Sequence, residues 1–142
     1  MQDYTTRLNK KVRKLGLRHA LSQKLKEGNL VVVSDLRAET HKTNALAKAM
    51  DLYGIGGKRG SPAFILDDAR DEDDGEEEEE EEEERDVRSV GGLDINFKVA
   101  SGNVPNVRVA NQLGANVYDI LKHEKLILSL AAITALEGRL MP

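Results

Sequence analysis

The sequence contains no cysteine and no tryptophan, and aromatic residues make up only 4% of its 142 positions. The lack of cysteine excludes disulfide bridges, thiolate metal sites and a cysteine nucleophile, and it is compatible with a reducing compartment. Because aromatic residues are scarce, leucine, valine, isoleucine and alanine must build the core. No apolar run approaches the roughly 20 residues of a membrane-spanning helix. The first ten residues are polar and basic, unlike a signal peptide.

The net charge of −4 conceals two segments of opposite sign. Residues 67–86 hold 16 acidic and 2 basic side chains, which gives this segment a charge of −14. The rest of the chain holds 19 lysines and arginines against 9 acidic residues, a charge of +10. A compact body with this positive charge predicts a polyanionic partner. The run Glu76–Glu84 is of low complexity and repels itself, so we expect it to be disordered.

Apolar segments with strand and helix patterns alternate along the chain. A protein of this length forms one ordinary domain, and the alternation predicts an α/β fold with a parallel sheet covered on both faces. The run at 30–33 is typical of a strand that is buried on both faces. The expected strands are 30–33, 63–66, 107–110 and 126–128. The expected helices are 6–28, 43–52, 93–101, 116–123 and 131–140.

The first expected helix has a packing face and a cationic face on the helical wheel. Gly28 is a good C-terminal cap for it. Small residues near the middle of the packing face would allow close approach to a sheet. The packing face contains Val12, Gly16, Leu17, Ala20 and Leu21. The cationic face covers an arc of roughly 100° and contains Arg7, Lys10, Lys11, Lys14 and Arg18.

Five cations on one arc are more than helix solubility requires, although an ordinary solvated face is the alternative. Further cations favour a surface that contacts phosphates. Because aromatic residues are sparse, stacking of single-stranded bases is not expected, and structured RNA recognised by shape and phosphate contacts fits better. The acidic run is either a solvated loop or a polyanion that masks the basic face until nucleic acid is present. The further cations are Lys42, Lys48, Lys58, Arg59 and Arg108.

The sequence does not match the motifs that bind nucleotides or metals or that carry out catalysis. The glycine-rich segment 54–60 does not fit G-x-G-x-x-G, because Arg59 occupies the third glycine position, and the segment precedes a strand instead of following one. Leu52 stands where a P-loop would begin. Ile127 stands where a zinc-binding H-E-x-x-H that starts at His123 needs its second histidine. We therefore expect no enzyme, no cofactor and no metal, and a flexible surface loop at 54–60.

Four separated segments carry a resemblance to one protein family. Leu8–Leu36 is similar to a family's first helix and following strand, and His41–Thr43 is similar to its Pro-Lys-Thr helix start, with histidine replacing proline. Asn103–Val107 is similar to an Asn-Leu-Pro-Asn-Val strand entry. The strongest match is NVYDILKHEKLILS, Asn116–Ser129. These segments resemble the universal large-ribosomal-subunit protein four family (ribosomal protein L-four), in its bacterial and mitochondrial type.

The resemblance implies a Rossmann-like three-layer α/β/α fold with a mostly parallel sheet of about four strands. It places one domain at 1–68 and 93–142 and makes 69–92 an acidic insertion. It also implies a non-enzymatic constituent of the large ribosomal subunit that binds large-subunit rRNA and neighbouring ribosomal proteins, with no membrane and no small-molecule substrate. By motif match, Lys10, Lys11, Arg13 and Lys14 take RNA-facing positions. The complete predicted RNA-binding set is Arg7, Lys10, Lys11, Arg13, Lys14, Arg18, Lys42, Lys58 and Arg59.

Two departures from the family limit what the resemblance implies. Family members carry residues before the first matched segment, including a long basic loop that reaches the polypeptide exit tunnel, so the tunnel role is not carried over. The glutamate run suggests a eukaryotic nuclear gene and therefore a mitochondrial ribosome, with a bacterial-type cytoplasmic ribosome as the alternative. A different class of function also stays open, an acidic-tract chaperone for basic proteins outside the ribosome.

Overall fold

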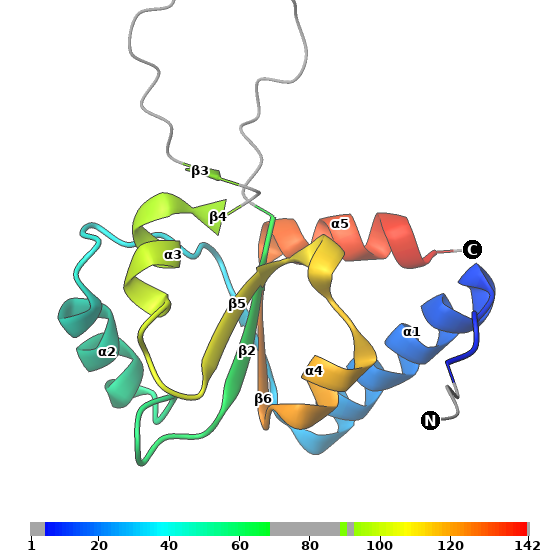
Figure 1. Ribbon diagram of the computed structural model, residues 1–142, viewed down its shortest axis with the longest axis horizontal. Coiled ribbons are helices and arrows are strands. Elements are labelled where there is room, and N and C mark those ends of the chain that lie inside the picture. Colours follow the sequence, from blue (N-terminus) through cyan, green and yellow to red (C-terminus); the bar gives the residue numbers. More distant parts are fainter. Residues whose placement is uncertain (1–4, 69–88, 91–92, 142) are drawn as a thin grey trace, which may run out of the picture.

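A four-stranded parallel sheet forms the centre of the domain in this computed structural model, which describes residues 5–68, 89–90 and 93–141 (Figure 1). The strand order is β1-β6-β2-β5. The predicted acidic insertion at 69–92 lies outside the described residues except for Ser89–Val90 (β3), which pairs with β4 in a small antiparallel sheet. The strands are β1 (Leu30–Val33), β2 (Ala63–Asp67), β4 (Leu93–Asp94), β5 (Val107–Asn111) and β6 (Lys125–Ser129).

Helices cover both faces of the sheet, which confirms the expected α/β architecture. Three helices, α1, α4 and α5, lie on one face, and α2 and α3 lie on the other (Figure 1). A 3-10 turn, η1, follows β5. The helical elements are α1 (Lys10–Glu27), α2 (Thr43–Leu52), α3 (Ile95–Ser101), η1 (Gln112–Gly114), α4 (Val117–Lys122) and α5 (Leu130–Leu140).

The central strand β2 divides the core into two layers. Successive side chains of a strand point to opposite faces, so Phe64 and Leu66 join the core under α1, α4 and α5, whereas Ala63 and Ile65 join the core under α2 and α3. These four side chains are at most 1% exposed. The continuous apolar run of β2 is therefore explained by a parallel strand with a helical layer on each side.

Three sequence predictions are wrong in detail. The helix expected at 93–101 begins at Ile95, because Leu93–Asp94 forms β4. The first helix begins at Lys10 instead of residue 6, because Asn9 has an extended backbone (φ −64°, ψ 148°) and starts the helix as its N-cap. Its predicted end is confirmed, since Gly28 adopts the left-handed conformation (φ 75°). The strand at 30–33 is not buried on both faces. It is the edge strand of the sheet, and Val31 and Val32 are 38% and 50% exposed.

The last residue of β2, Asp67, has a buried side chain. Asp67 is 3% exposed, and its Oδ1 accepts hydrogen bonds from Ser129 Oγ at 2.6 Å and from the backbone N–H of Asp68 at 2.8 Å. Burial raises the pKa of Asp67, and the nearby carboxylates of Asp35 and Asp68 act in the same direction. The neutral acid is therefore favoured in the folded protein relative to the unfolded chain.

The substitution Asp67→Asn is expected to stabilise the domain at pH 7, by on the order of 1 kcal/mol. Because its pKa is raised in the folded state, the wild-type Asp67 side chain contributes most to the free energy of unfolding at low pH. This contribution is lost as pH rises through the folded-state pKa. The amide imitates the neutral acid at every pH. The difference in urea unfolding free energy between variant and wild type should therefore shrink as pH falls towards 4. The exposed control Asp51→Asn should show no such trend, and a constant difference across this range would contradict the prediction.

Candidate nucleic-acid interface

Helix α1 is packed against the domain along its second half and exposed along its first. Leu17, Ala20 and Lys24 are its buried residues, whereas every residue from 10 to 15 is exposed. Val12, predicted to pack, is 49% exposed, so this part of the expected packing face is wrong. A Cβ atom on Gly16 would lie 3.6 Å from Val117 Cγ2. The small residue therefore faces α4 and not the sheet.

The exposed half of α1 concentrates positive charge. All six predicted basic residues of this region are exposed, and none of their side chains forms an ion pair or hydrogen bond with another described residue. The first turn of α1 contains no acidic residue, and the Asn9 side chain makes no capping hydrogen bond. The free backbone N–H groups and the positive end of the helix dipole therefore add to the side-chain charge. The six residues are Arg7, Lys10, Lys11, Arg13, Lys14 and Arg18.

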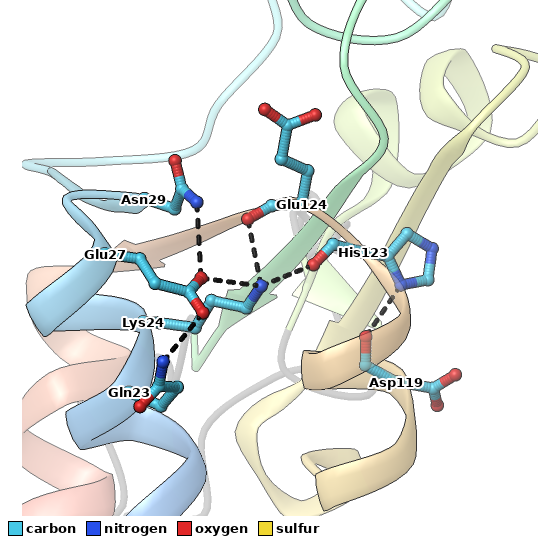
Figure 2. Close-up of polar contacts among 7 residues, drawn as sticks. All are labelled: Gln23, Lys24, Glu27, Asn29, Asp119, His123 and Glu124. Carbon is cyan, nitrogen blue, oxygen red and sulfur yellow. Dashed lines mark hydrogen bonds and ion pairs between the residues drawn. The ribbon is translucent and has the colours of Figure 1, made fainter.

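Lys24 fixes the second half of α1 to the domain (Figure 2). Its Nζ donates hydrogen bonds to the carbonyl oxygens of His123 at 2.8 Å and Glu124 at 3.0 Å, in the loop between α4 and β6. Glu27 Oε2 lies 3.6 Å from the same Nζ. Hydrogen bonds from Gln23 and Asn29, more than the charge of Lys24, lower the pKa of Glu27. The buried lysine therefore joins α1 to a loop about 100 residues later.

The loop that receives Lys24 is itself held by side chains. His123 Nδ1 lies 2.8 Å from the Asp119 carbonyl oxygen (Figure 2). Because a carbonyl oxygen can only accept, the Nδ1–H group is the donor of this hydrogen bond. The imidazole stacks on Phe64 at 5.6 Å. Asp119 is buried, and Arg108 Nη1 lies 3.0 Å from each of its two carboxylate oxygens. Asn116 Nδ2 donates a hydrogen bond to Oδ2 at 2.7 Å. The charge of Arg108 is thus paired within the fold, unlike the charges of the six exposed basic residues at the start of α1.

The glycine-rich loop 54–60 is held by backbone hydrogen bonds, in contrast to the flexible loop that we expected. The N–H of Gly57 donates to the Pro105 carbonyl at 2.9 Å, and Asn106 Nδ2 donates to the Gly57 carbonyl at 3.1 Å. Gly56 has φ +68°, and a Cβ atom there would lie 2.5 Å from Val107 Cγ2. This position therefore requires glycine. The loop presents Lys58 and Arg59 as exposed side chains.

The nine predicted RNA-binding residues do not form one surface. Six lie on α1 or just before it, on the sheet face shared with α4 and α5 (Figure 1). Lys42 is the N-cap of α2, on the opposite face of the sheet. Lys58 and Arg59 lie in the loop that leads into β2, at the amino ends of the strands, whereas α1 begins towards the carboxyl ends. The strongest cationic surface is therefore the exposed first half of α1 with Arg7 just before it, and we call this the projecting half of α1.

Other kinds of site receive no support from the part of the chain that the structure describes. No group of three or more histidine, aspartate and glutamate side chains is placed to hold a metal ion there. Among the same residues, no helix is long and apolar enough to cross a membrane.

Comparison with known proteins identifies a family. The model of the ribosomal protein L4/L1 family matches residues 1–139. The chain is 39% identical over 140 residues to the large ribosomal subunit protein uL4 of Rickettsia bellii (strain OSU 85-389) and to that of Rickettsia rickettsii (strain Sheila Smith). It is 37% identical to that of Rickettsia canadensis (strain McKiel). Each alignment covers 99% of this chain and 55% of the relative. The chain thus spans about half the length of the curated relatives it matches.

Proposed function

Because the chain belongs to the ribosomal protein L4/L1 family, we propose that it is a structural constituent of the large ribosomal subunit that binds large-subunit rRNA through the projecting half of α1. The observation that carries the RNA contact is the cationic arc of this half, which has no carboxylate partner among the described residues. Such unpaired charge is suited to neutralising phosphates. No catalytic step is part of this function.

The start of α1 supports binding of phosphate over binding of another ligand. Lys10, Lys11 and Arg13 stand in the first turn of the helix, where positive side chains are repelled by the helix dipole. This arrangement lowers helix stability in the free protein but becomes favourable when an anion binds at the same end. Backbone N–H groups at a helix start bind phosphate oxygens well. We infer that rRNA phosphates occupy this end, with contacts that recognise shape instead of base sequence.

The other predicted RNA contacts have a different geometry. Lys58 and Arg59 are exposed on a loop held by hydrogen bonds, so they can contact a second RNA segment without an ordering cost for the loop. Lys42 is exposed at the start of α2. A ribosomal protein enclosed by folded RNA can use cations on several faces, and we therefore retain these three residues as secondary contacts.

We propose that the ribosome concerned is mitochondrial. The nine consecutive glutamates at 76–84 support this assignment, because such runs are typical of eukaryotic nuclear genes. The compared relatives are bacterial, and a bacterial-type cytoplasmic ribosome is the alternative location.

Sedimentation tests the proposal directly. Lysates of purified mitochondria and of the post-mitochondrial supernatant, each from cells that express the tagged chain, are run separately on sucrose gradients. We expect the chain to follow the large subunit in the mitochondrial lysate and to be released by ribonuclease. Movement with a subunit only in the supernatant would place it on the other ribosome. A complex that survives ribonuclease and migrates apart from both subunits would favour the acidic-tract chaperone instead.

A further inference from the structure

The outer edge of β1 presents unpaired backbone groups. The Asn29 carbonyl accepts a hydrogen bond from the Leu126 N–H at 3.0 Å, and Leu30 is in register with Leu126. In a parallel pair with this register, Val31 and Val33 direct their N–H and C=O groups towards β6. Leu30 and Val32 then direct theirs to the other side, where the described residues provide no strand.

This edge lacks the features that usually protect a strand from pairing. Proteins place charged side chains, proline or bulges on exposed edges. The sequence of β1 is Leu-Val-Val-Val, without a charge or a proline, and its pairing with β6 is regular. Val31 and Val32 are nevertheless 38% and 50% exposed. A parallel sheet is normally covered on both faces and filled with apolar side chains, so an exposed apolar edge of this kind is suited to a further strand.

Two apolar hollows adjoin the edge, one on each face of the sheet. The first, of about 390 Å³, lies between α1 and α5 and is lined by Leu25, Leu30 and Leu140, among others. The second, also about 390 Å³, lies beside α2 and is lined by Val31 and Met50, among others. The side chains of an added strand would alternate between the two faces. Because both hollows are apolar, both sets of side chains on this strand must be apolar as well.

Charge distinguishes between possible occupants of the edge. Arg18 lines the hollow beside α1, and the rest of the cationic arc continues along the same helix; the acidic group on this lining is Glu137. A second copy that paired antiparallel through β1 would be related by a two-fold axis perpendicular to the sheet. This symmetry would bring the two α1 helices, and their cations, to the same face. Like-charge repulsion therefore disfavours a second copy and favours an occupant with acidic residues.

We propose that the β1 edge binds an extended apolar segment of another polypeptide, with acidic residues beside its apolar core, as a fifth strand of the sheet. This site shares Arg18 with the proposed RNA contact of α1 and otherwise uses the backbone groups of Leu30 and Val32 and the apolar side chains of the two hollows. Binding at one site does not require binding at the other.

The test uses the full chain and a six-residue synthetic peptide with four central β-branched apolar residues and a glutamate at each end. Exchange of backbone amides is followed by NMR. The Val31 amide already bonds to β6 and should not change, whereas the Val32 amide should gain about tenfold protection at a peptide concentration of about ten times Kd. The same peptide with alternate backbone nitrogens methylated should give no protection.

Substitution separates this site from non-specific binding. Val32→Lys, which places a charge on the edge, should abolish protection and peptide binding. Leu113→Lys, at a residue that is 67% exposed in η1, is the matched control and should bind as the wild type does. A peptide with lysine ends should bind more weakly than the glutamate peptide.

Several results would overturn the proposal. Unchanged exchange at Val32 with the glutamate peptide would show that the edge does not accept a strand. Protection of Val32 that appears with protein concentration alone, together with a dimer in sedimentation equilibrium, would assign the edge to a second copy. Protection by an rRNA fragment in place of the peptide would assign it to RNA. None of these results alters the predicted salt dependence of RNA binding through α1.

Discussion

Replacing Lys10, Lys11 and Lys14 together with alanine is expected to weaken binding to large-subunit rRNA by on the order of 100-fold at 0.1 M salt. The three side chains are exposed on the projecting half of α1 and have no partner among the described residues. Each phosphate that they neutralise releases bound counterions. The slope of log K against log salt concentration should therefore become shallower by about 2–3. Filter binding over 50–300 mM salt measures both quantities.

A second triple variant controls for the loss of charge. Lys48, Lys98 and Lys122 are exposed on α2, α3 and α4, and their replacement with alanine removes the same net charge. If long-range attraction to the whole protein dominates, both variants will bind alike. If α1 contacts the phosphates, the control will keep nearly the wild-type slope. Equal slopes for the wild type and the α1 variant would contradict the proposed interface. Helix content must be compared by circular dichroism, although alanine favours the helix.

The four strands of the main sheet and the five α-helices were predictable because each one has a strong local signal. The run Ala63–Leu66 is apolar and bounded by a glycine-rich turn and acidic residues, and it forms the central strand. The position of a strand within the sheet has no such signal. Leu30–Val33 is as apolar as β2, yet it lies at the edge, because strand order depends on pairings between residues about 100 positions apart. The start of α1 was also placed too early, since Thr6 and Arg7 do not themselves interrupt the helical pattern.

Of the features of the candidate site, only the arrangement of cations on one helix could be predicted from the sequence. The spacing of Lys10, Lys14 and Arg18 sets them on one arc, whatever the tertiary structure. The sequence could not show that Arg108 is paired with Asp119, because that contact depends on how β5 lies beside α4. Lys24 was missed although a signal exists. It follows Leu17 by seven residues, and a lysine on the apolar side of a helix is a candidate for burial.

The substitution Lys24→Ala is expected to lower the free energy of unfolding by about 2–4 kcal/mol. The side chain is 5% exposed, and its removal leaves the carbonyl oxygens of His123 and Glu124 without their charged donor. The ion pair with Glu27 contributes little, since the Glu27 side chain is 38% exposed. Lys24→Met keeps most of the buried alkyl chain and removes only the hydrogen-bond donor. This variant should therefore lose less unfolding free energy, about 1–3 kcal/mol. Urea unfolding of both variants separates the contribution of the buried alkyl chain from that of the Nζ hydrogen bonds.

The same helix supplies the control for Lys24 and connects stability with function. Lys26 is exposed in the last turn of α1, and Lys26→Met should change the unfolding free energy by less than about 0.5 kcal/mol. If Lys24→Met proves as stable as Lys26→Met, the two hydrogen bonds do not hold α1 on the domain. Because Lys24 fixes the half of α1 opposite to the cationic end, Lys24→Met should weaken RNA binding without making its salt slope shallower. A slope as shallow as that of the triple lysine variant would show instead that Lys24 itself contacts phosphate.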